Sequence, residues 1–235
     1  MAPKLGTLMF PGESIDDLKT DKNGKTILGP GLRRTYAAIH IIKAGILQFK
    51  EPNEYWIESP EKRYIATKGD SVIGIVTQRT GDAFRIDIGA SEQASLSYMA
   101  FEGATKKNRP DVKVGDIIYA RLQVANKDME PELVCMDSTG RSNGYGVIRD
   151  GGFMIKCPLH HIRRILRPNC PLLKTLGDMM PYETAVGING RIWVKGRSTI
   201  ETITIANIIS DSEHCSDSDM KTFVKSRVHA LSGLH

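Results

Sequence analysis

Hydrophobic residues along the chain change their spacing twice, and each change predicts a different kind of structure. In the first 60 residues, short apolar runs are broken by turn signals such as Pro11-Gly12 and Gly29-Pro30-Gly31. Turn signals that recur about every ten residues are typical of short strands in a compact sheet. We therefore expect residues 1–60 to form a small N-terminal β-domain.

Between residues 61 and 140, apolar and polar positions alternate more regularly. This alternation predicts five strands, and Gly74 and Gly89 stand where tightly coiled strands need a residue without a side chain. Five short strands of this kind are typical of a closed barrel with the oligonucleotide-binding (OB) fold. The strands are expected near residues 72–76, 84–88, 96–98, 115–122 and 132–136.

After Gly140 the spacing becomes helical, so residues 141–235 should form an α/β domain. The segments HHIRRILR and CPLLKTLGDMM read as helices, whereas TAVGINGRIWVK alternates as two strands around Asn189-Gly190. Ser198 and Glu201 have the spacing of a capping box, and apolar residues from Met220 to Leu231 follow one face of a last helix.

Composition supports several domains and a soluble chain. The protein has 235 residues, 40% of them hydrophobic, which is enough to bury a core in each of two or three small domains. No apolar run is long enough to cross a membrane, and the first residues lack the pattern of a secretory signal. We expect an intracellular protein with no membrane partner.

The net charge of +5 is unevenly distributed, because most of the basic excess falls within residues 141–235. Discrete cationic patches are therefore expected, rather than a generally basic surface.

The sequence contains no arrangement of residues that predicts catalysis. The cysteines lack CxxC or zinc-finger spacing, so neither a disulfide framework nor a metal site is expected. Single carboxylates do not form the cluster that a metal-dependent nuclease needs, and phosphate-binding or hydrolase motifs are missing. We expect no enzyme, no catalytic residue and no cofactor. The residues considered are Cys135, Cys157, Cys170, Cys215, Asp70, Asp82, Asp87 and Asp116.

The segment SLSYMAFEGATKKNRP, residues 95–110, is the leading candidate for binding a polyanion. It places Lys106, Lys107 and Arg109 in one loop with no acidic residue between Gly103 and Pro110. Ammonium and guanidinium groups in such a loop can hold phosphates without reading bases; contact with a neighbouring protein is the alternative. Tyr98 could stack on a base or could pack in a core or interface.

Several motifs give the chain a resemblance to a known family. GDSVIGIVTQRTGDAFRIDIG followed by ASLSYM is similar to the ribosomal S-one type of RNA-binding domain. Together with FPGE, GPGLRR, KKNRP, VGDIIYAR, ANKDMEPELVCMDSTGR and NGRIWVK, the whole chain resembles the ribosomal RNA-processing protein 40 family of RNA exosome cap subunits.

This resemblance implies three domains, namely an N-terminal β-domain (1–60), an S-one/OB-fold barrel (61–140) and a divergent K-homology (KH) domain (141–235). It implies a non-catalytic subunit that stabilises a ring of RNase PH-like proteins and guides RNA into its central channel for 3′-to-5′ processing and degradation. The implied partners are RNA, the ring subunits, other cap subunits and associated 3′-to-5′ exoribonucleases, and the implied location is nucleus, nucleolus and cytoplasm. A free-standing S-one-type RNA-binding or ribosome-associated factor remains the alternative.

Two positions depart from the patterns of these domains. Exposed aromatic residues of S-one domains correspond here to Asp82 and Arg85, so Arg85 is expected to stack on a base or reach a phosphate.

Gly187-Ile188-Asn189-Gly190 invites comparison with the GXXG clamp of KH domains. Because it lies between two strands, we interpret Gly187, Asn189 and Gly190 as a structural turn.

A second basic cluster, Arg163, Arg164 and Arg167, lies on adjoining turns of a predicted helix. RNA and an acidic protein surface are both possible targets.

Overall fold

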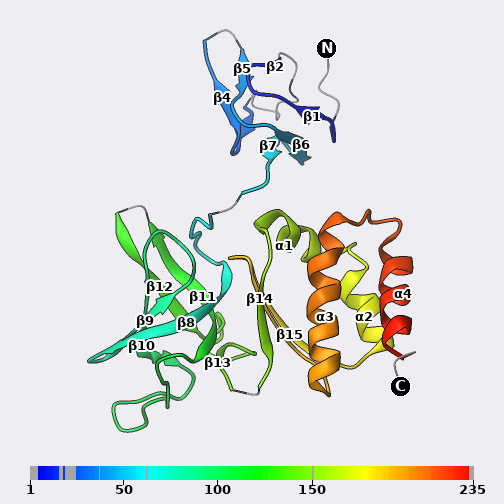
Figure 1. Cartoon of the computed structure of the whole chain (residues 1–235). Coiled ribbons are helices and arrows are strands. Elements are labelled where there is room, and N and C mark those ends of the chain that lie inside the picture. The colour runs from blue at the N-terminus through cyan, green and yellow to red at the C-terminus, as the bar shows by residue number, and fades with distance from the viewer. Residues whose placement is uncertain are drawn as a thin grey trace. The chain divides into compact units, whose positions relative to one another are not determined.

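The computed structural model describes residues 5–15, 18, 25–36, 38–61, 63–126, 128–149 and 151–232 (Figure 1). The chain divides into two compact units, Met1–Glu61 and Lys62–His235. None of the helices in the described part has the length and apolar character that crossing a membrane requires.

The first unit is built from two small sheets around one core. One sheet has the order β1-β6-β7-β3 and the other β2-β5-β4. Alternation along β6 and β7 points Leu47, Tyr55 and Ile57 inward, where they join Ile15 and Ile41. The strands are β1 (Leu8–Met9), β2 (Ser14–Ile15), β3 (Ile27–Leu28), β4 (Leu32–Arg34), β5 (Ile39–Ile41), β6 (Gly45–Lys50) and β7 (Glu54–Glu58).

The second unit begins with a five-stranded barrel. Its strands run in the order β12-β10-β9-β8-β11, and pairing of β11 with β12 closes the ring. Strand β13 pairs with Ile117–Tyr119 of β11, ahead of the residues of β11 that pair with β12. The strands are β8 (Ser71–Thr80), β9 (Ala83–Asp87), β10 (Ala94–Phe101), β11 (Ile117–Asn126), β12 (Met129–Cys135) and β13 (Gly146–Ile148).

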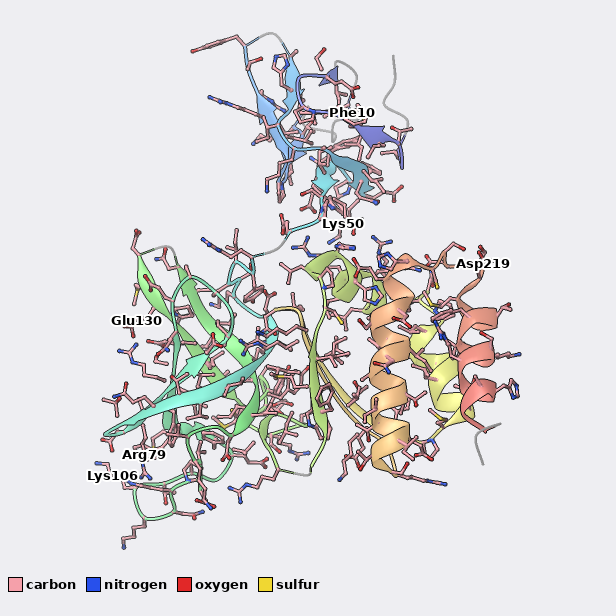
Figure 2. The ribbon with its side chains drawn as sticks, viewed as in Figure 1. Phe10, Lys50, Arg79, Lys106, Glu130 and Asp219 are labelled. Atoms are coloured by element: carbon pink, nitrogen blue, oxygen red, sulfur yellow. The ribbon has the colours of Figure 1, made fainter. Side chains whose placement is uncertain are left out.

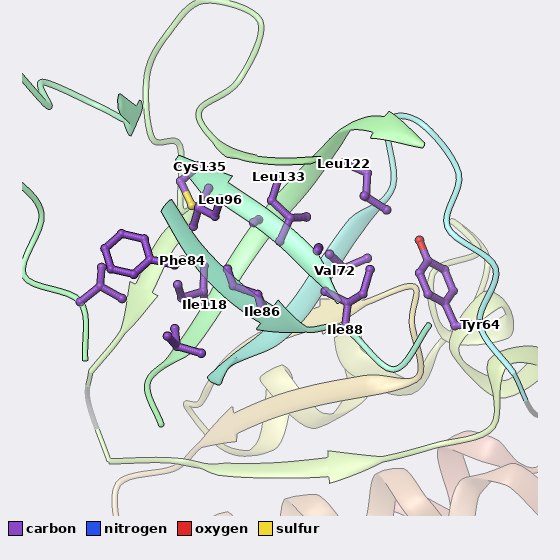
Figure 3. Close-up of a cluster of buried hydrophobic side chains, with 14 of the residues drawn as sticks. Tyr64, Val72, Phe84, Ile86, Ile88, Leu96, Ile118, Leu122, Leu133 and Cys135 are labelled. Carbon is purple, nitrogen blue, oxygen red and sulfur yellow. The ribbon is translucent and has the colours of Figure 1, made fainter. Parts of the chain in front are cut away.

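Alternating residues of all five strands fill the barrel (Figure 3). Phe84, Ile86 and Ile88 are buried together, as their shared parity along the sequence requires. A Cβ atom at Gly74 would overlap the side chain of Ile86, so the missing side chain lets two strands approach closely.

The remainder of the second unit is a three-stranded antiparallel sheet with helices. The sheet order is β14-β16-β15, and apolar residues of β16 such as Ile192 and Val194 share a core with the helices. Ser198 caps α3 by accepting a hydrogen bond from the Glu201 N–H at 3.2 Å. The elements are β14 (Phe153–Lys156), α1 (Leu159–Ile165), α2 (Leu172–Met179), β15 (Glu183–Gly187), β16 (Arg191–Lys195), α3 (Thr199–Asp211), the 3-10 turn η1 (Ser212–His214) and α4 (Met220–Ser232).

This architecture confirms the predicted fold class, a small β-domain, a closed OB-like barrel and a C-terminal α/β domain. The sequence pattern does not predict strands β13 and β14, because each contains only three or four residues and lies beside glycines.

Candidate nucleic-acid interface

The loop that follows β10, residues 102–110, has a defined backbone conformation. Gly103 has a φ of +68°, and the Thr105 N–H donates to the Asn108 carbonyl at 3.0 Å. The Asn108 N–H donates in turn to the Thr105 hydroxyl, also at 3.0 Å. These bonds close a tight turn whose tip is formed by the residues between Thr105 and Asn108.

Lys106 and Lys107 occupy this tip, and both are exposed. Neither forms an ion pair with any residue that the structure describes. Figure 2 shows Lys106 extending outward from the loop. Both ammonium groups are therefore available to an external anion, which is the arrangement that binding a phosphate backbone requires.

Arg109 fastens the loop to the barrel instead of projecting freely. Its guanidinium carbon lies 4.7 Å from the centre of the Tyr98 ring, and its Nη2 lies 3.2 Å from Oδ1 of Asp82. Asp82 sits in the β8–β9 turn, and its carbonyl accepts a hydrogen bond from the Tyr98 N–H at 3.2 Å. A cation–π contact and an ion pair thus join the cationic loop to the end of two barrel strands.

Tyr98 belongs to the barrel core, with only 7% of its surface exposed. Arg109 covers the ring face that remains. The placement corresponds to the packing alternative, and stacking on a base would require Arg109 to move off the ring.

Arg85 lies on the outer face of β9, where it is already paired. Its Nη1 is 2.6 Å from Oε2 of Glu130, and both side chains are partly exposed. The hydrogen bond and the charge of Glu130 raise the pKa of the Arg85 guanidinium. A phosphate that bound Arg85 would have to compete with this carboxylate.

Arg79 is a cationic residue near this surface that sequence reasoning missed. It is exposed near the end of β8, with its guanidinium carbon 6.0 Å from the Phe84 ring. The ion pair between Arg109 and Asp82, in the turn that follows β8, brings the end of β8 and the loop together. We name Arg79, Lys106, Lys107 and Arg109 the cationic surface of the barrel. The polar end of β8, with Gln78 and Arg79 after an apolar run, was the available signal.

The segment Gly187–Gly190 joins the barrel to the C-terminal domain. Asn189 is 7% exposed, and its side-chain amide pairs with both backbone groups of Ile73 in β8. Oδ1 accepts from the Ile73 N–H at 3.2 Å, while Nδ2 donates to the carbonyls of Ile73 at 2.8 Å and Ile88 at 2.7 Å. The Ile188 N–H also donates to the Ser71 carbonyl at 2.9 Å. The turn therefore forms hydrogen bonds with Ser71 and Ile73 of β8, which precede the residues of β8 that pair with β9.

Backbone geometry requires glycine at both ends of this turn, for a different reason at each position. Gly190 has a φ of +84°, and a Cβ atom there would lie 2.8 Å from the Cys157 carbonyl. At Gly187 a Cβ atom would lie 2.7 Å from the Ile73 nitrogen. A clamp on RNA would need this backbone exposed, whereas here it is packed against the barrel.

An ion pair lies beside the turn. Arg191 is buried, and its Nη2 is 2.6 Å from Oδ2 of Asp87 at the end of β9. Burial acts to raise the pKa of Asp87, but the hydrogen bonds from Arg191 and Gly89 outweigh it and the pKa lies below its ordinary value. Asp87 is thereby held ionised beside the Arg191 guanidinium, and the charge of Lys156 lowers its pKa further.

The junction between α1 and α2, where KH domains carry their GXXG clamp, spans residues 166–171 and contains no glycine. Within the predicted basic patch, Arg164 is turned inward. Its Nε lies 2.8 Å from Oδ1 of Asp217, and its other nitrogens donate to the carbonyls of Ser212, Glu213 and Cys215. Arg164 thus connects α1 to the segment between α3 and α4.

Neither a metal cluster nor a disulfide occurs among the described residues. All four cysteines are free, and burial raises the pKa of Cys135 to about 12 and of Cys157 to about 11. The thiols of Cys135 and Cys157 are therefore protonated at neutral pH and are poor nucleophiles.

The fold and these contacts define a multidomain protein in which an OB barrel with a cationic loop is locked to a KH-like domain. Family models match three segments: "Mammalian exosome complex component RRP40, N-terminal" at residues 6–60, "Exosome complex component RRP40, S1 domain" at 64–146 and "KH domain" at 152–200.

Relatives described as exosome complex component RRP40 match most of the chain. The human protein is 49% identical, with 87% of this chain and 76% of that protein covered. The Drosophila melanogaster protein is 49% identical (91% and 93% covered), and the Saccharomyces cerevisiae protein is 36% identical (93% and 93% covered). The chain belongs to the exosome complex component RRP40 family.

A solved structure titled "Crystal structure of putative exosome complex RNA-binding protein" has the same fold. It matches with a TM-score of 0.57 and 23% identity, over 72% of this chain and 99% of the other.

Proposed function

We propose that this protein is a non-catalytic, RNA-binding subunit of the exosome that stabilises the RNase PH-like ring and guides RNA toward the central channel. Membership of the exosome complex component RRP40 family supports the proposal that this protein assembles into the exosome. The observation that carries RNA guidance is the pair of exposed lysines, Lys106 and Lys107, held at the tip of a hydrogen-bonded loop without any described ion partner. Contacts of this kind position a backbone without selecting a sequence, which suits a protein that passes many RNAs onward.

The first unit carries the features expected of a docking module. Leu8 and Ile46 lie opposite each other on β1 and β6 and are 60% and 41% exposed, and Phe10 is 54% exposed (Figure 2). An apolar cross-strand pair that faces solvent is stabilised when a partner covers it. We propose that this face contacts the ring, and that other cap subunits and a 3′-to-5′ exoribonuclease complete the assembly.

Hydrolysis of RNA is assigned to other subunits. The carboxylates near the cationic surface, Asp82 and Glu130, each form an ion pair with an arginine. Carboxylates used in this way do not form the cation-binding cluster that phosphodiester hydrolysis needs. We also propose that the protein works in the nucleus, the nucleolus and the cytoplasm.

The guidance proposal can be tested in the reconstituted complex with the double variant Lys106→Ala and Lys107→Ala. Ultraviolet crosslinking of this subunit to a single-stranded RNA is measured over a series of salt concentrations. Each lost phosphate contact should reduce the slope of log affinity against log salt by about 0.7, so the double variant should lose about 1.4.

The matched control is Lys221→Ala with Lys225→Ala, which removes two exposed lysines from α4. Crosslinking by the control should equal that of the unmodified protein. An unchanged yield and slope for the loop variant would assign the loop to protein contact and remove the support for RNA guidance.

A further inference from the structure

A groove separates strand β14 from helix α3. It has a volume of about 830 Å³, within the range of roughly 300–1,000 Å³ that ligand sites occupy. One wall is formed by residues 151–156 and the other by residues 195–210. The groove lies apart from the cationic surface of the barrel and has no part in the proposed guidance of RNA.

The outer edge of β14 is unpaired among the described residues. Strand β14 pairs only with β16, in antiparallel register. The Cys157 N–H donates to the Gly190 carbonyl at 2.8 Å, so residues of the same parity, Phe153 and Ile155, direct their backbone groups toward β16. Met154 and Lys156 therefore direct their N–H and C=O groups away from the sheet, where a further strand can bind them.

The groove beside this edge is apolar at its base. Ile155 and Ala206 line it, and Phe153 and Ile203 remain 54% and 50% exposed at its sides. Phe153 and Ile155 share the parity of Val194 and Ile192, which pack against the helices, so their side chains lie on the helical face of the sheet. Alternate side chains of an added strand would enter this apolar space.

The charge of the lining is entirely positive. Arg197 lines the groove, and none of the described lining residues is acidic. Lys156 pairs with Arg191 and has the opposite parity to Ile155, so its side chain lies on the other face of the sheet, where its charge also lowers the pKa of Asp87 and where alternate side chains of an added strand would meet it. Helix α3 begins at the same place, and the partial positive charge of its N-terminus is already offset by Glu201 in its first turn, whose Oε2 accepts a hydrogen bond from the Arg197 N–H at 3.0 Å. An occupant with carboxylates would complement Lys156 and Arg197, whereas a basic peptide would be repelled.

We propose that this groove binds an extended, acidic segment of a partner protein, which adds to β14 as a fourth strand of the sheet. A peptide is favoured over RNA because Met154 and Lys156 each offer both an N–H donor and a C=O acceptor at strand spacing. A peptide backbone offers both kinds of group at strand spacing, whereas the phosphates of RNA only accept and its 2′-hydroxyl donors do not recur at the spacing of a β-strand. At about 3.3 Å per residue, β14 accommodates some four to six residues of the segment.

The test uses the full chain and a fluorescein-labelled octapeptide of alternating valine and aspartate. Fluorescence anisotropy should show saturable binding, and exchange of the Met154 and Lys156 amides with solvent should slow. An alternating valine and lysine octapeptide should not bind. Methylation of the peptide nitrogens of one parity should abolish binding, and methylation of the other parity should leave it unchanged, because only one set faces β14.

The chain variant Lys156→Glu with Arg197→Glu should weaken binding roughly tenfold, since two attractive contacts become repulsive. The control Lys221→Glu with Lys225→Glu makes the same change of charge on α4 and should bind normally. The proposal is overturned if the acidic peptide does not bind at millimolar concentration, if both methylated forms bind equally, or if oligouridylate displaces the peptide and protects the groove instead.

Discussion

Substitution of Asn189 by alanine tests the contact between the barrel and the KH-like domain. The change removes three hydrogen bonds and leaves the Ile73 N–H and the Ile88 carbonyl without the partners described above. The Ile73 carbonyl keeps a contact with Arg191 at 3.4 Å. Two buried backbone groups without partners, at about 1–3 kcal/mol each, give an expected loss of about 2–6 kcal/mol in the free energy of unfolding.

The measurement is urea unfolding followed by the fluorescence of Trp193, which is buried in β16. Trp56 belongs to the first unit, so Trp56→Phe is introduced into every protein and the signal then reports the second unit alone. Amide exchange at Ile73 should accelerate in the Asn189→Ala protein, because its acceptor has been removed.

The control is Asn169→Ala, which truncates an exposed asparagine in the α1–α2 connection. It should change the free energy of unfolding by less than about 0.5 kcal/mol. If Asn189→Ala behaved like this control, and exchange at Ile73 stayed slow, the side-chain amide would not join the two domains and the reasoning would be refuted.

Three other changes have defined outcomes. Gly74→Ala should destabilise the barrel by about 1–3 kcal/mol in urea unfolding, because the new Cβ overlaps Ile86; an unchanged midpoint would show that the strands can separate freely. Burial lowers the pKa of His161, despite its hydrogen bond to the Ile209 carbonyl, so the unfolded chain takes up a proton first and stability should fall as pH drops below about 6.5. His161→Gln should reduce this pH dependence, and an identical pH profile would contradict the assignment. Arg109→Ala should cost about 0.5–1.5 kcal/mol and alter tyrosine fluorescence, whereas the double lysine variant of the same loop should do neither.

Much of the fold follows from local pattern in the sequence. Alternation placed Phe84, Ile86 and Ile88 in the barrel core, and the spacing of Ser198 and Glu201 marked the start of α3. These features depend on neighbours along the chain, so hydrophobic period and capping chemistry are sufficient to predict them.

The candidate site was less predictable, because its geometry depends on long-range contacts. The three cations of the loop look equivalent in sequence, yet Arg109 is held by Tyr98 and Asp82 while the two lysines are not. The pairing of Asn189 with Ile73 joins residues that are 116 positions apart. No local pattern indicates which distant backbone group a side chain will meet.

The most direct test of the central claim maps where RNA contacts this subunit inside the assembled exosome. A photoreactive single-stranded RNA is threaded into the complex, crosslinked and digested, and the modified peptides are identified by mass spectrometry. The account predicts adducts on the loop of residues 102–110 and on the end of β8 near Arg79. Adducts confined to other segments of this chain, with the loop unmodified, would contradict it.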